Sequence, residues 1–160
     1  MLFRSADTFC LSTQVGCAMA CAFCLTGKMG LSRNLTAGEI VGQVRALLAA
    51  TDIRTAYNLV FMGMGEPLHN YDATTKALRI LTDRQGLAIP PRRITVSTVG
   101  LPPALDRLAQ EPVMPNLAVS LHAPTDHLRG QLVPVNRKYP IADVIAACRR
   151  FPLKRRARIT

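Results

Sequence analysis

Residues 57–62, Tyr-Asn-Leu-Val-Phe-Met, form a short apolar run that passes directly into Gly63-Met-Gly65-Glu66-Pro67. A run of this length that ends at turn residues is typical of a strand buried on both faces of a parallel sheet. Gly63 and Gly65 permit a tight turn after the strand. Pro67 favours an extended backbone at Glu66. The stretch therefore predicts a buried strand whose carboxyl end presents an acidic turn.

Helical periodicity is found on both sides of this strand, because apolar residues recur there every three to four positions. A capping box begins the upstream helix at Thr36-Ala-Gly-Glu39. Asp72 is predicted to cap the downstream helix, which should end before Gly86. Two later helices are predicted after prolines that suit a first turn, Pro102-Pro103 and Pro140. The last helix is predicted to bury one apolar face, made of Ile141, Val144, Ile145 and Cys148.

Further strands are predicted at residues 8–15, 93–98, 116–121 and, as a beginning only, 156–160. Strands separated by helices form right-handed βαβ units, so the fold class is α/β with about four to five parallel strands. The chain has 160 residues, whereas a complete eight-unit βα barrel needs about 250. We therefore expect one domain with an incomplete (βα) barrel.

The composition describes a folded, strongly basic protein. Apolar residues make up 49% of the chain and the mean hydropathy is +0.16, which excludes a disordered chain. Twenty Lys and Arg against ten Asp and Glu give a net charge of +10, which favours an anionic partner such as nucleic acid. Five cysteines are an odd number, and four of them lie between Cys10 and Cys24, unlike a secreted disulfide framework.

An uncharged stretch from Thr8 to Gly27 raises the question of export. Asp7 lies where a signal peptide is basic, and Ser12-Thr13-Gln14 interrupts the apolar run. The stretch is also too polar and too rich in cysteine to cross a membrane. We therefore expect a cytoplasmic protein that does not associate with membranes.

Three cysteines at Cys17-Ala-Met-Ala-Cys21-Ala-Phe-Cys24 are the strongest chemical signal. Structural zinc usually takes four ligands, often from two separated Cys-x-x-Cys pairs, and the sequence has no second pair. Three thiolates on a four-iron cluster leave one iron free to bind a substrate or cofactor. Two other interpretations stay open, namely three buried cysteines or a zinc site that His122 completes.

Polar residues follow the predicted strands at their carboxyl ends, where functional groups gather in parallel βα assemblies. The cysteine loop follows the first strand, Gly65-Glu66 follows the second, Ser97 ends the third, and Ser120–His122 end the fourth. These residues are therefore expected on one rim. Taken singly, the two serines and His122 are more commonly structural than ligand-binding.

The cysteine spacing is the signature of radical S-adenosylmethionine (SAM) enzymes, and the chain resembles one subfamily, the RlmN/Cfr type. The resemblance runs in order from about Phe9 onward. It rests on Cys10-Leu-Ser-Thr-Gln-Val-Gly-Cys17, Arg33-Asn-Leu35, Gly63-Met-Gly-Glu-Pro-Leu68, Val96-Ser-Thr-Val-Gly100, Ser120-Leu-His-Ala123 and Val133-Pro-Val-Asn136. It implies methylation of adenine C2 in 23S ribosomal RNA and, in the RlmN branch, transfer RNA.

The resemblance also assigns residue roles. Cys17, Cys21 and Cys24 would hold a [4Fe–4S] cluster. Cofactor contacts would come from Gly65, Glu66, Ser97, Ser120, Leu121 and His122, with Gly65-Glu66 binding the amino group of SAM. Cys10 matches the cysteine that resolves the RNA-linked intermediate, a task that needs a thiol of near-neutral pKa beside the base; otherwise it is a buried strand thiol.

The sequence departs from the resemblance in one respect. Full-length members carry a methylated cysteine near their C-terminus, and no position of this chain corresponds to it. We expect residues 1–160 to be a truncated radical SAM core that lacks the N-terminal RNA-binding domain and the C-terminal strands. An electron donor such as flavodoxin and a monomeric state are expected as well.

Basic residues are dense near the end of the chain, with six in Arg149–Arg158, and Lys and Arg bind phosphate in a sequence-independent way. They are also typical of a solvated helix end. Two alternative functions stay open, a radical SAM enzyme that acts on a substrate other than RNA and a non-enzymatic, zinc-containing RNA-binding module.

Overall fold

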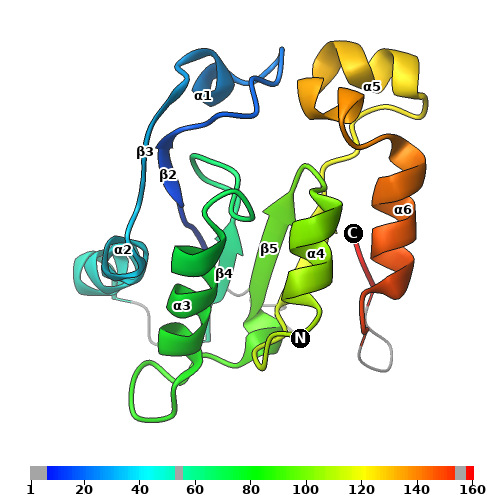
Figure 1. The fold of residues 1–160 in the computed structure, drawn as a ribbon. Helices are drawn as coiled ribbons and strands as arrows, with labels where there is room; N and C mark the ends of the chain where they lie inside the picture. Colours follow the sequence, from blue (N-terminus) through cyan, green and yellow to red (C-terminus); the bar gives the residue numbers. More distant parts are fainter. Residues whose placement is uncertain (1–6, 53–55, 154–157) are drawn as a thin grey trace, which may run out of the picture.

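The computed structural model describes residues 7–52, 56–153 and 158–160. Its main sheet has four strands in the order β1-β4-β5-β6, and each neighbouring pair is parallel. The strands are β1 (Thr8–Cys10), β4 (Asn58–Phe61), β5 (Ile94–Thr98) and β6 (Asn116–Val119). In Figure 1 the helices stand beside the sheet with the strand arrowheads pointing to one end. The predicted α/β class with parallel strands is confirmed.

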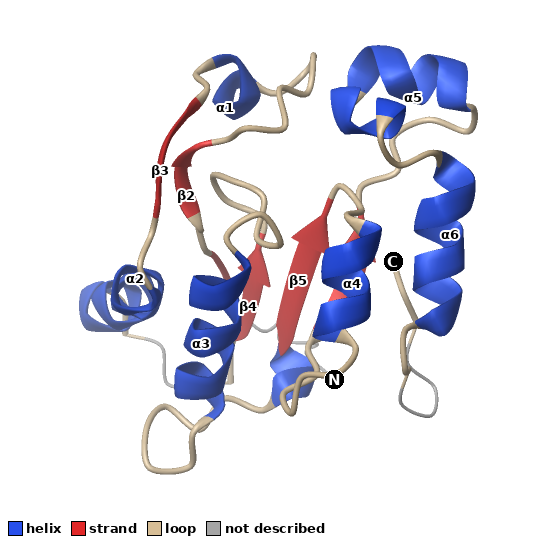
Figure 2. Cartoon of the chain, in the orientation of Figure 1, coloured by secondary structure: helices blue, strands red, loops and turns tan. Residues whose placement is uncertain are grey.

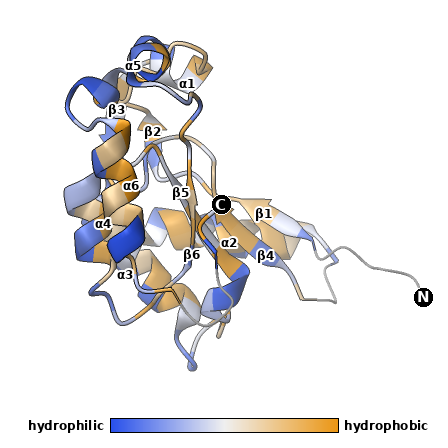
Figure 3. Ribbon diagram, turned by 90° about the vertical axis from the view of Figure 1, so that its right-hand side faces the viewer, coloured by the Kyte–Doolittle hydropathy of each residue, from blue (hydrophilic) through white to orange (hydrophobic). Residues whose placement is uncertain are grey.

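Four helices form the layer that packs on the sheet, and their bounds are α2 (Ala37–Ala50), α3 (Tyr71–Thr82), α4 (Pro102–Leu108) and α6 (Ile141–Arg150). Helix α2 packs against α3, and α4 packs against α6. Figure 3 shows helices on one side of the sheet, while its other side lies open around β1 and β4. The core lies between sheet and helices, where Leu59, Ile94 and Leu105 are buried.

The open side corrects the prediction that the strand at residues 57–62 is buried on both faces. Leu59 and Phe61 are buried against the helices, but Val60 is half-buried and the Met62 side chain is 51% exposed. The alternation arises because, among the described residues, the helices cover a single face of the sheet. The apolar run is therefore a half-covered strand.

A single strand over residues 8–15 was also wrong. The segment contains β1 and a separate strand β2 (Gln14–Gly16), which pairs antiparallel with β3 (Leu31–Asn34). Gly16 adopts φ +82°, and a Cβ there would meet the Gly30 carbonyl oxygen at 1.8 Å. The tight approach brings β2 and β3 together at the base of the loop that carries Cys17, Cys21, Cys24 and the short helix α1 (Leu25–Lys28) (Figure 2).

The helix starts follow the sequence signals except at α3. The capping box is confirmed, since Thr36 Oγ1 accepts from Glu39 N at 3.2 Å and Glu39 Oε2 accepts from Thr36 N at 2.8 Å. Asp72 does not cap α3, which begins at Tyr71 after Asn70. The Asn70 side chain is held elsewhere, because its amide donates to two loop carbonyls.

The buried face of α6 also differs from the prediction. Val144 and Ala147 are buried, whereas Ile145 is 36% exposed and Cys148 is only half-buried. The helix therefore presents to α4 a stripe rotated away from Ile145.

Residue 160 extends the sheet beyond β6. Val119 N donates to the Thr160 oxygen at 2.7 Å, and Thr160 N donates to the Leu117 oxygen at 3.1 Å. Both bonds are those of a parallel pair. Of the strand predicted at residues 156–160, positions 156 and 157 lie outside the described residues. Among the described residues, no helix is long and apolar enough to cross a membrane.

Helix α5 (Asp126–Leu132) and the 3₁₀ helix η2 (Pro134–Arg137) lie at the carboxyl end of the sheet, and a further 3₁₀ helix, η1 (Pro91–Arg93), precedes β5. Arg129 of α5 has an exposed fraction of 0%. Its guanidinium donates to the carbonyls of Val99, Leu121 and Tyr139 and to the Asn136 side chain. One buried cation therefore joins the ends of β5 and β6 to η2.

Replacing Arg129 with Met should destabilise the chain by about 3 kcal/mol or more, because buried carbonyls lose charged donors without gaining water. Urea unfolding followed by circular dichroism measures the loss. Arg150→Met is the matched control, since that side chain pairs with Asp106 on the surface. An Arg129→Met chain as stable as the control would contradict this role.

Candidate functional site

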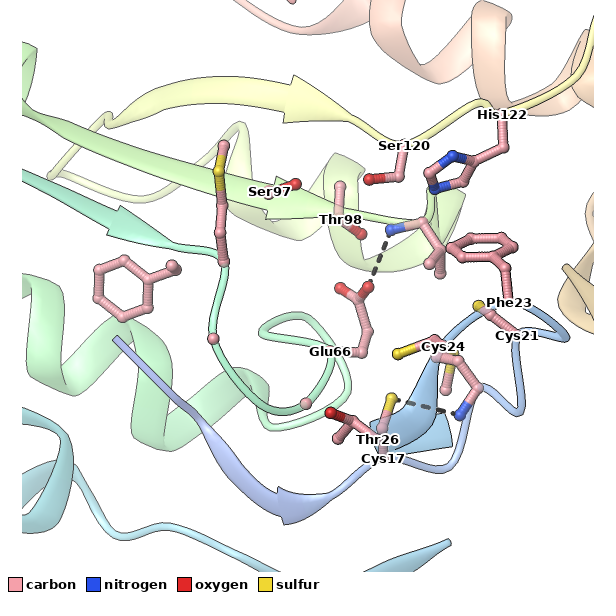
Figure 4. A pocket seen from close by; sticks show the side chains of 16 residues that line it. Cys17, Cys21, Phe23, Cys24, Thr26, Glu66, Ser97, Thr98, Ser120 and His122 are labelled. Carbon is pink, nitrogen blue, oxygen red and sulfur yellow. Dashed lines mark hydrogen bonds between the residues drawn. The ribbon is translucent and has the colours of Figure 1, made fainter. Parts of the chain in front are cut away.

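A cavity of about 330 Å³ lies at the carboxyl ends of β4, β5 and β6, between the strands and the cysteine loop. Figure 4 shows side chains from these strand ends and from the loop facing one another across it. The lining residues are Cys17, Met19, Cys21, Phe23, Cys24, Thr26, Phe61, Met62, Gly63, Gly65, Glu66, Ser97, Thr98, Val99, Ser120 and His122. All candidate site residues except Cys10 and Leu121 are among them.

The cysteine loop is held in place by backbone hydrogen bonds at both ends. Cys17 N donates to the Gly30 oxygen at 2.9 Å, which closes the hairpin behind the loop. Ala22 N donates to the Leu132 oxygen at 2.9 Å, which ties the loop to the end of α5. The loop is therefore held on one side by the β2–β3 hairpin and on the other by α5.

Burial is the main cause of the raised pKa values of two loop thiols, Cys17 and Cys21. Burial raises the pKa of the Cys17 thiol, and the negative charges of Glu66 and Cys24 add to the effect. The pKa of Cys21 rises to about 11, mainly through burial and then through the charges of Cys17 and Cys24. Thiolates so close together in a buried site need a compensating positive centre, and metal ligation supplies one as the thiols lose their protons.

The three cysteines of the loop line one cavity and are the candidate metal ligands. Within the described ranges, no three His, Cys, Asp or Glu side chains are grouped closely enough to hold one metal ion. A single tetrahedral zinc needs sulfurs about 3.8 Å apart, given Zn–S bonds of about 2.3 Å. A four-iron cluster binds each thiolate at a different iron and so takes more widely spaced sulfurs around one cavity. The three thiols that line this cavity are the donor set that a four-iron cluster takes.

His122 lines the same cavity as the cysteines. Its imidazole packs against the Phe23 ring, with centroids 4.5 Å apart. It adopts φ +63°, the left-handed region that few residues other than glycine occupy. The pair forms a wall of the cavity.

Glu66 lies at the turn after β4 and is 3% exposed. Its Oε1 accepts from Leu68 N at 3.0 Å, and its Oε2 accepts from Val99 N at 2.8 Å. These backbone amides fix the carboxylate between the ends of β4 and β5. Gly65 allows the turn at φ +101°.

The Glu66 carboxyl is a buried acid among neutral donors. Burial raises its pKa, while the Val99 amide, the Thr98 hydroxyl and the Leu68 amide lower it. None of the ion pairs found within the described ranges involves Glu66. A carboxylate has about four acceptor positions, so it can still bind a cationic ligand in the cavity. An ammonium group would supply the missing positive charge.

Of the other four candidate residues, the two serines line the cavity, whereas Leu121 and Cys10 do not. Ser97 and Ser120 line the cavity across from the turn that carries Glu66 (Figure 4). Leu121 lies outside the lining, and its carbonyl accepts from Arg129 Nε at 3.2 Å. Cys10 is exposed on the open face of the sheet, where its Cα pairs with that of Val60, and it does not line the cavity.

Sequence reasoning missed two residues that shape this site. Gln14 is 1% exposed and contacts the Glu66 turn, and Val99 supplies an amide to the carboxylate. Gln14 lay in the polar break at Ser12-Thr13-Gln14 and in the motif from Cys10 to Cys17, but neither pattern gave it a role of its own. Val99 acts through its backbone, which leaves no mark in the residue type.

Comparison with known proteins places the chain in a family. The model of the radical SAM superfamily matches residues 11–153. The chain is 56% identical over 154 residues to a "dual-specificity RNA methyltransferase RlmN" of Geobacter sulfurreducens, with 96% of this chain and 42% of the relative covered. The corresponding protein of Pelobacter propionicus is 53% identical over 154 residues, with 96% and 44% covered.

A solved structure agrees with these relatives. The crystal structure of a radical SAM methyltransferase from Sphaerobacter thermophilus matches with a TM-score of 0.85 and 57% identity, over 94% of this chain and 45% of that one. The chain thus spans less than half the length of the proteins it resembles. Because the family model covers most of its residues, the chain belongs to the radical SAM superfamily.

Proposed function

We propose that this chain is the cofactor-binding core of an enzyme that methylates C2 of adenine in 23S ribosomal RNA and transfer RNA. One observation carries the proposal. Three cysteines and a buried, uncompensated carboxyl share one cavity in a chain more than half identical to RNA methyltransferases of the RlmN type. The superfamily uses a [4Fe–4S] cluster and SAM.

The cysteine loop would hold the cluster through Cys17, Cys21 and Cys24. When bound and reduced, the cluster supplies the electron that cleaves SAM at its open iron. The hairpin and α5 anchor the loop from two sides, so the three sulfurs face the strand ends. Cys17 and Cys21 are buried and Cys24 is half-buried, which would limit the access of water to the bound group.

The strand ends would hold SAM. Glu66 accepts hydrogen bonds from its ammonium group, while Leu68 N and Val99 N hold the carboxylate in place. Ser97 and Ser120 offer hydroxyls on the opposite wall. The tilted rings of Phe23 and His122 would line one side of the bound cofactor.

RNA would approach the open end of this cavity. Lys28 ends α1, and Lys138 follows η2, so basic residues stand on the two segments beside the carboxyl end of the sheet. Together with the net charge of +10, they favour a phosphate backbone as partner. Cys10, on the open face nearby, is proposed as the residue that resolves the RNA-linked intermediate.

The remaining parts of the reaction are assigned to a longer protein. We propose that the methyl-carrying cysteine, an N-terminal RNA-binding domain and further strands lie outside these 160 residues, as the length of the relatives suggests. The proposal includes a cytoplasmic, monomeric enzyme reduced by a donor such as flavodoxin.

Anaerobic reconstitution with iron and sulfide should load about four irons and four sulfides per chain. Cys21→Ser should lower the iron content at least severalfold, because a thiolate ligand is lost. Cys148→Ser serves as the control, since that half-buried thiol lies on α6 away from the cavity. Metal analysis that finds zinc without iron or sulfide would instead support the zinc-containing module.

Glu66→Gln should weaken SAM binding about tenfold to a hundredfold, because a charged hydrogen bond to the ammonium group becomes a neutral one. Equilibrium dialysis with the reconstituted chain gives the dissociation constants. Glu111→Gln is the control, because Glu111 pairs with Arg79 and Tyr71 far from the cavity. Equal affinities for the Glu66→Gln and wild-type chains would refute the assigned role.

The reduced, reconstituted chain should release 5′-deoxyadenosine from SAM without transferring a methyl group to RNA, because the cysteine that carries the methyl is absent. Chromatography of the nucleoside and the label from methyl-labelled SAM in an RNA transcript measure the two events. Label in RNA would show that these residues suffice for transfer.

A further inference from the structure

Gln14 occupies a buried position between the cysteine hairpin and the acidic turn. It begins β2 three residues before Cys17 and is 1% exposed. Its Oε1 accepts from Glu66 N at 2.9 Å. Its Nε2 lies 2.7 Å from Asn34 Oδ1 on β3 and 3.0 Å from His69 Nδ1. One side chain therefore bridges three segments that meet at the site.

The orientation of this amide follows from its partners. A backbone N–H can only donate, so the atom that faces Glu66 N must be the Gln14 oxygen. The NH₂ group then points to the other two partners, and each of them must accept. Asn34 thus presents its oxygen, and His69 presents an unprotonated Nδ1 with its proton on Nε2. No alternative flip of Gln14 satisfies the Glu66 amide.

Gln14 also packs directly on the residue before Glu66. A Cβ added at Gly65 would lie 2.6 Å from Gln14 Cβ and 2.7 Å from its Cγ. The absence of a side chain at Gly65 is what lets the two backbones approach. The packing contact is made with Gly65 and the hydrogen bond with Glu66, which are consecutive residues. Gln14 of β2 therefore fixes both the position and the orientation of this turn.

We propose that Gln14 is a positioning residue that fixes Glu66 relative to the cysteine loop. This inference rests on the proposed function, in which Glu66 binds the SAM ammonium group and the loop holds the cluster. The two ligand sets come from different parts of the chain, and SAM has to reach both at once. Asn34 and His69 hold the Gln14 amide in place. Gln14 in turn keeps the distance between Glu66 and the cysteine loop constant.

Gln43 of α2 provides a matched comparison, because its side chain holds Ser12, two residues before Gln14. Its side chain accepts from Ser12 N and donates to the Ser12 oxygen, both at 2.9 Å. It is likewise a glutamine that ties α2 to this stretch of chain, but it touches neither the Glu66 turn nor the cavity. Loss of Gln43 should therefore affect stability without affecting ligand binding.

The test compares the Gln14→Met and Gln43→Met chains with wild type after anaerobic reconstitution. Gln14→Met keeps the length of the side chain and removes its hydrogen bonds. We expect the dissociation constant for SAM to rise about tenfold in Gln14→Met, with unchanged iron per chain. The constant should stay within about twofold of wild type in Gln43→Met. Urea unfolding of both variants reports stability separately.

The outcomes separate this inference from the proposed function. A wild-type chain that takes up iron but binds no SAM would overturn the proposed function and, with it, the role of Gln14. Wild-type affinity in Gln14→Met, or a loss of affinity that follows the loss of stability equally in both variants, would overturn the inference alone.

A second measurement needs neither cofactor nor variant. The ¹⁵N spectrum of the His69 ring in the wild-type chain near neutral pH should show the proton on Nε2 and an unprotonated Nδ1. A ring protonated on Nδ1 could not accept a hydrogen bond from Gln14. This result would overturn the proposed set of hydrogen bonds around Gln14, whether or not the Gln14→Met chain folds.

Discussion

The structure depends on one buried carboxylate. Glu66 receives backbone amides from Leu68 and Val99, so a single side chain joins the turn after β4 to the end of β5. Burial of an acid without a cation is costly, and backbone donors offset only part of that cost. The part of this cost that the amides do not offset can be met by a positive charge in the cavity. A cationic ligand that supplies this charge is bound more tightly than an uncharged one of the same shape.

The parallel sheet explains why this carboxylate lies beside the cysteines. All carboxyl strand ends in such a sheet lie at one edge, so residues distant in sequence converge there. The hairpin then returns over that edge, and α5 receives the cysteine loop through the Ala22–Leu132 hydrogen bond. Arg129 joins the supporting segments by donating to Val99, the residue whose amide holds Glu66. The cysteine loop and the strand ends that carry Glu66 are thus connected by one network of hydrogen bonds.

The sequence predicted those features that local periodicity encodes and missed those that long-range pairing creates. The run at residues 57–62 and the capping box at Thr36 are local patterns, and both elements exist. Strand β3 has four exposed residues, so it lacks the alternation that marks a strand, and only its pairing with β2 forms it. The grouping of the cysteines with Glu66 was predictable from strand order. The buried bridge of Gln14 was not, because glutamine carries no signal of burial.

The thiols and the carboxyl also constrain each other. Burial raises the pKa of Cys17 and Cys21, and the charge of Glu66 adds a smaller effect, so the site without its ligands favours protonated, neutral sulfur. A bound [4Fe–4S]²⁺ core would replace three thiol protons, so the site with its three thiolates would carry about one net negative charge beside Glu66. An ionised Glu66 in turn attracts an ammonium group. The negative charge of the thiolate-bound cluster and that of Glu66 would therefore both favour a cationic ligand in this cavity.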